Sequence, residues 1–184
     1  ARMHLFKGLA SIGVLAFAGL LSACQGGSDG ASGTAAPSAA NAPSAPPKLA
    51  PLPGKEGAVP ALSEFTTVRL ATTAGDVVIE VYPAAAPNAA RRFLELVTAG
   101  FYDDTPISRV VPGFVAQFGV NWREPHRAWE NRQFRDDPTL FALERGTLAF
   151  AKAGPDTNST QVFINYVENN RLAAPQFNFT VFGK

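Results

Sequence analysis

The chain has 184 residues, a formal net charge of +1 and an ordinary apolar content. That length is enough for one domain with a core, and a nearly neutral chain without a dense run of Lys or Arg is not expected to bind nucleic acid. The only cysteine is Cys24, and the two histidines, His4 and His126, lie far apart in the sequence. This inventory provides neither a disulfide framework nor a set of metal ligands.

Residues 1–23 have the layout of a secretory signal peptide, with a basic start followed by an uncharged apolar run. The run is short for a membrane-spanning helix, which takes ~20 apolar residues. It ends in Leu21-Ser22-Ala23-Cys24, which resembles the lipobox of bacterial lipoproteins, whose cysteine is lipidated and becomes the first residue of the mature protein. An ordinary Ala-x-Ala cleavage site fits less well, because Leu21 is large where a small residue is wanted.

We therefore expect a lipid anchor at Cys24, with simple secretion as the alternative. The expected location is the bacterial cell envelope, where the anchor holds the protein to a membrane. Gln25 rather than aspartate follows the cysteine, which in a Gram-negative host favours the outer membrane, facing the periplasm.

Residues 24–63 are rich in Gly, Ser, Ala and Pro, with scarcely a large apolar side chain before Leu49 and Leu52. Such a segment cannot bury enough surface to offset the entropy lost on ordering. It is predicted to be a flexible linker, and residues 64–184 are predicted to form the domain.

The domain is predicted to begin with a β-hairpin. Its strands are Thr67 to Thr72 and Val77 to Tyr82, joined by a short turn that contains glycine. A helix should follow from Pro87 to Thr98, because proline suits its first position and apolar residues recur from Ala90 at i, i+3, i+4 and i+7. Gly100 is placed to end it.

The stretch from Arg109 to Gln117 combines a cation and an amide with apolar residues that are expected to be buried. It predicts two short strands with a bend at Pro112-Gly113 between them. Because arginine is rarely buried without a partner, the side-chain oxygen of Gln117 is a candidate partner for Arg109. The alternative is a half-exposed strand whose arginine faces water.

The remaining segments contain no second long amphipathic pattern. Residues 121–138 are predicted to be a surface loop, and strands are expected near 146–152, 161–166 and 179–182. Strand and helix do not alternate, which argues against a parallel doubly wound sheet. The sequence is mainly β, and many short strands with one helix favour an antiparallel barrel.

Seven motifs then stand in one order. They are Thr73–Pro83, Ala86–Leu94, Gly100–Asp103, Arg109–Gly119, Arg145–Ala151, Ala153–Asn165 and Val181–Lys184. From about Thr66 to Lys184 the chain closely resembles the cyclophilin-type peptidyl-prolyl cis/trans isomerases. The loop ending in Asp136-Asp137-Pro138 and the segment Asn169–Leu172 resemble a bacterial branch of that family.

The resemblance implies an isomerase that binds proline-containing segments of client proteins. It assigns the catalytic arginine to Arg109, which Gln117 orients. Apolar side chains are assigned to the cup for the proline ring, and others to the wall that binds the residues before the proline. The cup is Phe114, Phe163 and Leu172 with Val115 beside it; the wall is Ala151, Lys152 and Gln161, and Phe179 is a further substrate contact.

This chemistry needs no nucleophile, metal or cofactor. The X-Pro amide resists rotation by ~18–20 kcal/mol because its nitrogen lone pair is shared with the carbonyl. A guanidinium that donates to that nitrogen would localise the lone pair and stabilise the twisted transition state. The alternative from another class is a cyclophilin-like binding module or chaperone that holds proline segments without turnover; intact Arg109 and Gln117 argue against it.

Four positions depart from the family pattern. Ser108 stands where many relatives have histidine, Lys152 where many have asparagine, Phe179 where histidine is frequent, and Arg171 where a tryptophan is associated with tight cyclosporin binding. These departures are expected to change substrate and drug contacts. Relatives also continue past Val-Phe-Gly with a second helix and a closing strand, so we expect one unpaired barrel edge and a weakened scaffold.

Overall fold

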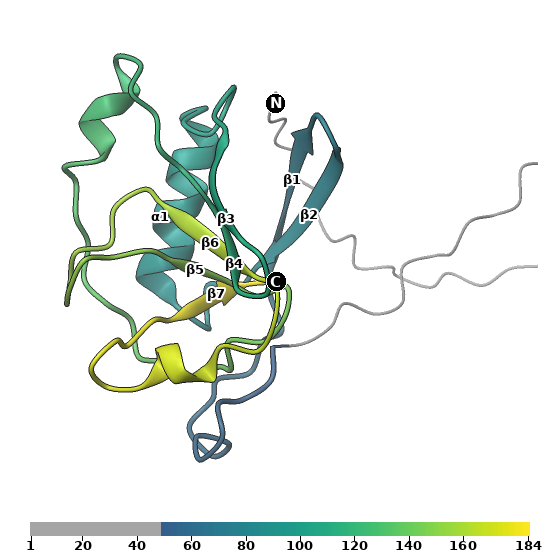
Figure 1. Ribbon diagram of the computed structural model, residues 1–184. Coiled ribbons are helices and arrows are strands. Elements are labelled where there is room, and N and C mark those ends of the chain that lie inside the picture. Colours follow the sequence, from purple (N-terminus) through teal and green to yellow (C-terminus); the bar gives the residue numbers. More distant parts are fainter. Residues whose placement is uncertain (1–48) are drawn as a thin grey trace, which may run out of the picture. The chain divides into compact units, whose positions relative to one another are not determined.

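A computed structural model describes residues 49–184, so the predicted signal peptide, Cys24 and most of the predicted linker lie outside the described residues. The described part is mainly β, with one α-helix, and its strands form a single seven-stranded antiparallel sheet (Figure 1). The strand order is β1-β2-β7-β5-β6-β4-β3. The elements are β1 (Thr66–Thr72), β2 (Gly75–Val81), α1 (Pro87–Thr98), β3 (Ile107–Val111), β4 (Val115–Phe118), η1 (His126–Trp129), β5 (Leu148–Phe150), β6 (Val162–Asn165), η2 (Asn170–Ala173) and β7 (Val181–Gly183).

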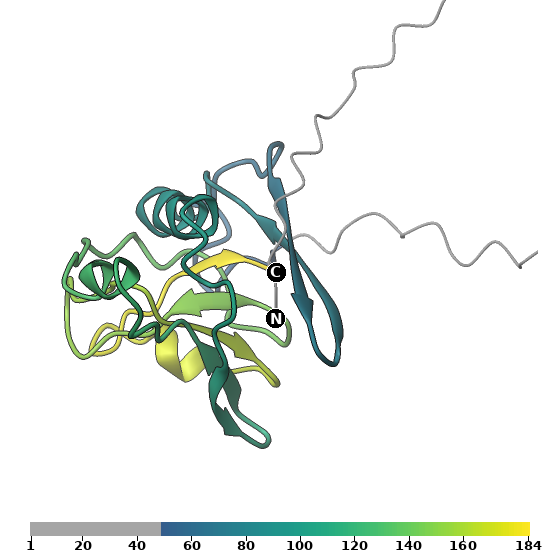
Figure 2. The ribbon, with the colours of Figure 1, turned by 90° about the horizontal axis from the view of Figure 1, so that it is seen from above.

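The predicted fold class is confirmed, although the sheet curls into a half-barrel rather than closing. Strands β1 and β3 are its two edges. In Figure 2 the hairpin of β1 and β2 lies at one side of the curled sheet, apart from the hairpin of β3 and β4. The first hairpin turns more tightly than predicted, because Thr72 pairs with Gly75 and only two residues remain in the turn. Gly75 has φ +122°, which explains the glycine at this position.

The central strands bury both of their faces. Side chains alternate across a strand, and in β6 Val162 packs on the side of α1 while Phe163 packs on the opposite side. In β7 the order is reversed, with Val181 opposite the helix and Phe182 beneath it. The sheet therefore has two apolar layers, and the second lies under the site described below.

Helix α1 has the predicted bounds and covers the first layer with Ala89, Ala90, Phe93, Leu96 and Val97. Its N-terminus has no cap from the preceding residue. Instead, the carboxylate of Asp137 accepts hydrogen bonds from the backbone N–H groups of Asn88 (3.1 Å) and Ala89 (2.9 Å). A negative charge at this end of a helix also interacts favourably with the helix dipole.

The predicted boundary between linker and domain is too late in the chain. Leu49 is 4% exposed in the second apolar layer, together with Phe141 and Leu143. The backbone N–H of Leu52 donates to the Leu140 carbonyl at 2.8 Å. Low apolar content made residues 49–63 look like linker, but Leu49, the partly buried Leu62 and a few backbone hydrogen bonds attach this segment to a core built elsewhere.

Strand β3 is an exposed edge strand, not the buried strand that its apolar residues predict. Ile107 and Val110 are each 54% exposed, and Arg109 is exposed as well. An edge strand packs on one side only, which leaves its outer side chains in water. Between residues 49 and 184 the structure has no helix long and apolar enough to cross a membrane.

Candidate functional site

Arg109, Gln117 and Phe163 are aligned across three neighbouring strands. Arg109 of β3 pairs with Gln117 of β4, and Gln117 in turn pairs with Phe163 of β6. Residues that pair directly in antiparallel strands project from the same face of the sheet. The pairing therefore places a cation, an amide and an aromatic ring side by side on the face opposite α1.

A cavity of about 220 Å³ opens over this face. Nine side chains line it, all of them residues that the sequence assigned to catalysis or substrate binding: Arg109, Phe114, Val115, Gln117, Ala151, Lys152, Phe163, Leu172 and Phe179. The tenth, Gln161, lines an adjoining hollow of about 300 Å³ that shares Gln117, Ala151 and Lys152 with the first. A mostly apolar pocket with a few convergent polar groups is typical of a ligand site.

Gln117 does not pair with Arg109 as expected. Its side-chain Nε2 donates to Oε1 of Gln161 at 2.7 Å, which joins the two hollows. Arg109 is exposed at the rim of the cavity, and within residues 49–184 its guanidinium has no hydrogen bond or ion pair. Its donors are therefore available to a ligand.

Phe114 is held in the cavity by its backbone. It ends a turn in which its N–H donates to the Val111 carbonyl at 3.0 Å, and Gly113 takes φ +68°. Its own carbonyl accepts from the N–H of Tyr166 (2.9 Å) and from Nδ2 of Asn169 (3.3 Å). Asn169 is 4% exposed. Nothing in the sequence predicted that Asn169 holds the Phe114 carbonyl, because a buried asparagine in a polar loop has the same local sequence pattern as an exposed one.

The rest of the cup comes from segments far apart in the chain. The rings of Phe163 and Phe179 meet edge to face, with centroids 5.5 Å apart, a favoured geometry for aromatic pairs. The N–H of Phe179 donates to the Leu172 carbonyl at 3.0 Å, so the two loop residues are fixed to each other. The guanidinium of Arg171 lies 5.0 Å from the centre of the Phe114 ring and covers it.

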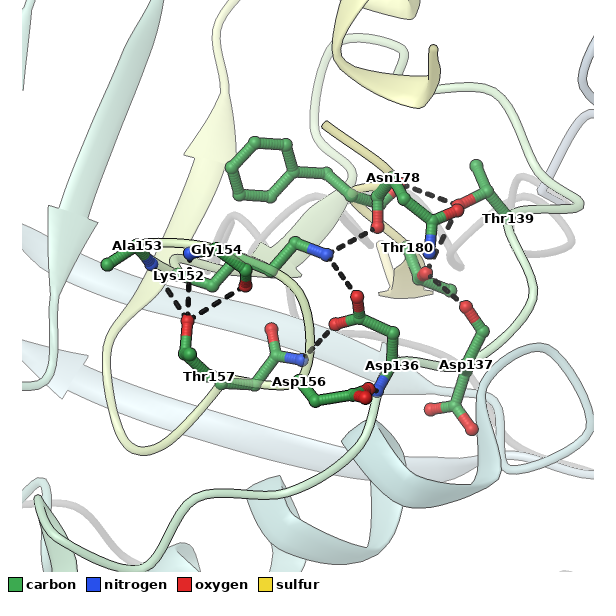
Figure 3. A network of polar contacts seen from close by, with 12 residues as sticks. Asp136, Asp137, Thr139, Lys152, Ala153, Gly154, Asp156, Thr157, Asn178 and Thr180 are labelled. Carbon is green, nitrogen blue, oxygen red and sulfur yellow. Dashed lines mark hydrogen bonds and ion pairs between the residues drawn. The ribbon is translucent and has the colours of Figure 1, made fainter. Parts of the chain in front are cut away.

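Lys152 lines the cavity, but its charge is already paired. The Nζ atom lies 2.5 Å from Oδ2 of Asp136 and 3.0 Å from the Asn178 carbonyl, and the side chain is only 4% exposed (Figure 3). Lys152 is thus part of the cavity wall, as the sequence assigned it, but its ammonium group is bound within the protein. Asp136 was not predicted as a site residue; the only signal was an acidic pair, Asp136-Asp137, before Pro138.

The two adjacent carboxyl groups have opposite pKa shifts. Burial acts to raise the pKa of Asp136, but hydrogen bonds from Lys152 and Asn158 outweigh it and the pKa is lowered. Burial raises the pKa of Asp137, and the N–H groups of Ala89 and Asn88 offset only part of that effect. Asp136 is therefore the ionised member of an ion pair, while the pKa of Asp137 lies above its ordinary value.

Between residues 49 and 184 no group of three or more His, Cys, Asp or Glu side chains is arranged to hold a metal ion. The site consists of a cation at the rim, an amide pair, an apolar cup and one internally paired lysine. This arrangement can hold a small apolar ring and direct hydrogen-bond donors at a group beside it.

Known proteins are similar to this chain in both sequence and fold. Residues 67–184 match the family model of the cyclophilin type peptidyl-prolyl cis-trans isomerase/CLD. The chain is 35% identical over 129 residues to peptidyl-prolyl cis-trans isomerase-like 3 of Rhizopus delemar, covering 64% of this chain and 74% of that protein. It is 36% identical over 125 residues to a peptidyl-prolyl cis-trans isomerase of Acinetobacter baylyi, covering 65% of each.

A crystal structure of a cyclophilin type peptidyl-prolyl cis-trans isomerase from Cryptosporidium parvum superposes with a TM-score of 0.55 at 28% identity, over 66% of this chain and 77% of that one. The same enzyme in the presence of the dipeptide Ala-Pro gives a TM-score of 0.53 at 29% identity, over 64% and 77% of the two chains. The fold and site thus define a proline isomerase. The chain belongs to the cyclophilin-type peptidyl-prolyl cis-trans isomerase family.

Proposed function

We propose that this isomerase acts on X-Pro bonds of exported or envelope proteins and that Arg109 stabilises the twisted amide in the transition state. The observation that carries the mechanism is the guanidinium of Arg109, which has no partner among the described residues and lies at the rim of an apolar cavity, aligned with Gln117 and Phe163. A proline ring held in the cup would bring its amide nitrogen to that rim.

The planar amide offers little to a guanidinium at its nitrogen, because the lone pair is delocalised into the carbonyl. During rotation the nitrogen becomes pyramidal and its lone pair becomes a hydrogen-bond acceptor. A donor from Arg109 therefore gains strength only in the transition state, which is the condition for raising kcat. The apolar cup adds to the effect because charge interactions strengthen where water is excluded.

The cup and the amide pair have separate roles. Phe114, Phe163 and Leu172 hold the ring so that the acyl side rotates against a fixed proline. Gln117 and Gln161 fix the wall along which the residues before the proline lie. No covalent intermediate forms, and the substrate leaves with only its ω angle changed.

The test is a protease-coupled assay with an Ala-Pro peptide, comparing the chain with an Arg109→Ala variant. We expect kcat/KM to fall about 100-fold, the size of loss seen when one preorganised donor to a transition state is removed, while peptide binding stays measurable. Arg145→Ala is the matched control, because Arg145 is exposed and does not line the cavity. Near-full activity of folded Arg109→Ala would exclude the mechanism, and peptide binding without turnover by the unaltered chain would favour a non-catalytic binding module.

We also propose that Cys24 carries a lipid that anchors the protein in a bacterial envelope. The support is the lipobox-like Leu21-Ser22-Ala23-Cys24 and a bacterial relative among the similar enzymes. In a bacterial host, Cys24→Ala should move the protein from the membrane fraction to the soluble fraction, and Ser22→Ala, which keeps the cysteine, should not. Failure of labelled fatty acid to enter the unaltered protein would exclude the anchor and leave simple secretion.

A further inference from the structure

Lys152 reaches from the wall of the cavity to a fixed acceptor behind it. Figure 3 shows its ammonium group between the Asp136 carboxylate and the Asn178 carbonyl. Asp136 does not line the cavity. The pair thus connects the cavity wall after β5 with two loops, the one before Pro138 and the one before β7.

The Asp136 carboxylate is itself held in place. Its Oδ1 accepts from Nδ2 of Asn158 at 2.6 Å, and its backbone N–H donates to Oδ1 of Asp156 at 2.7 Å. Both partners belong to the turn between β5 and β6, and Asn158 is buried. An aspartate held at its carboxylate by Asn158 and at its backbone N–H by Asp156 provides a rigid attachment point for a lysine.

The loop that Lys152 holds needs external support. Asn178 has φ +49°, a left-handed conformation that costs energy for a residue other than glycine. Three hydrogen bonds hold it there, two of them from outside the loop: Lys152 donates to its carbonyl, Oγ1 of Thr139 donates to its Oδ1 at 2.8 Å, and its own N–H donates to the Ala174 carbonyl at 2.8 Å. Phe179 follows directly, and its ring lies 5.5 Å from the Lys152 ammonium.

We propose that Asp136 and Lys152 are positioning residues for the proline cup. Their ion pair holds the turn at Asn178 so that the Phe179 ring stands edge to face against Phe163 and closes one side of the cup. The inference rests on the proposed function, since it assumes that the cup receives the proline ring.

The pair has a second consequence, for specificity. An unpaired lysine in this wall would attract an acidic residue next to the proline. Because Asp136 already neutralises Lys152, the wall presents no net charge. The enzyme should therefore treat Glu-Pro and Ala-Pro peptides nearly alike, in spite of the lysine.

The test compares Asp136→Asn, Lys152→Met and the double variant for kcat, KM and free energy of unfolding, with both peptides. The Asp136→Asn substitution would keep a contact with the Asn158 amide but remove the charge, so Lys152 is released. We expect this variant to raise KM for Ala-Pro about tenfold, less than the ~100-fold that a 1 Å misplacement can cost, with kcat nearly unchanged. It should also gain a preference for Glu-Pro, which Lys152→Met lacks.

The double variant separates positioning from simple stability. Removing both charges of a buried pair is often neutral for stability, whereas removing one is costly. We expect the double variant to recover the free energy of unfolding but to keep the raised KM, because the bond to the Asn178 carbonyl is still missing. This variant keeps the test informative if a single variant fails to fold.

A matched control is Glu144→Gln, which breaks the Glu144–Lys184 ion pair (3.2 Å) away from the cavity and should leave KM unchanged. A double variant with both normal stability and normal KM would overturn the proposal, as would unchanged KM in Asp136→Asn. If the enzyme is active, either of these results would overturn the positioning role of the ion pair without contradicting the role of Arg109. An inactive unaltered chain, by contrast, would overturn the proposed function itself.

Discussion

Gln117 pairs directly with Arg109 across β3 and β4, yet its side chain bonds to Gln161 on the far side. A hydrogen bond of 2.7 Å between the two amides connects β4 to the segment before β6 and joins the two hollows of the site. The cation at the rim is left with its donors free within the described residues.

The Gln117–Gln161 bond predicts coupled losses of activity. Gln117→Ala and Gln161→Ala should each lower kcat/KM about tenfold, and the double variant should be hardly worse than either, because both substitutions remove the same bond. The measurement is a double-mutant cycle in the isomerase assay. Losses that multiply would show that the two side chains act separately.

Arg171 predicts weak inhibition by cyclosporin. It stands where the resemblance places a drug-contacting tryptophan, and its guanidinium covers the Phe114 ring at 5.0 Å. A guanidinium offers neither the flat apolar face of an indole nor the same N–H donor. Arg171→Trp should therefore tighten inhibition measured by titration of the active enzyme, and strong inhibition of the unaltered chain would contradict the prediction.

The lowered pKa of Asp136 predicts how stability depends on pH. Folding lowers this pKa, so the pair stabilises the fold above the ordinary carboxyl pKa of about 4, and its contribution is lost as the pH falls through the folded-state pKa. The free energy of unfolding of the unaltered chain should exceed that of Asp136→Asn most near neutral pH, and the difference should shrink toward about pH 3.

Because other charged groups lie near Asp136, the comparison of the unaltered chain with Asp136→Asn needs a control. Burial and, to a lesser degree, the charge of Asp136 raise the pKa of Asp137, so its effect on stability has the opposite sign. Lys152 and Asp156 also contact Asp136. Chemical denaturation of Glu144→Gln over the same pH range supplies the baseline for losing a partly exposed carboxylate. A difference that does not change with pH would show that the pair contributes no charge-dependent stability.

The burial of Leu49 predicts that residues before β1 stabilise the domain. Leu49→Ala should lower the free energy of unfolding by about 2–3 kcal/mol, the lower part of the range for buried leucines, because the segment can partly adjust. Lys55→Ala, at an exposed position in the same segment, should change it by less than about 0.5 kcal/mol. Equal effects in denaturant titrations would mean that the segment behaves as linker.

Local patterns in the sequence determined much of this protein. The bounds of α1 followed from Pro87, the apolar spacing after Ala90 and Gly100, and the bend between β3 and β4 followed from Pro112-Gly113. These features depend on the backbone preferences and side-chain periodicity of a few neighbouring residues, so they can be read directly from the sequence. The order of seven motifs indicated the family, and the resemblance assigned the nine residues that line the cavity.

Only the tertiary structure decided which groups satisfy one another. The partner of Lys152 is 16 residues earlier in the chain, the partner of Gln117 is 44 residues later, and Leu49 enters a core made by strands far along the sequence. A charge or an amide in the sequence states what it can bond but not what lies within reach. The curl of the sheet determines which groups lie within reach of one another, because it brings loops from separate parts of the chain over one face.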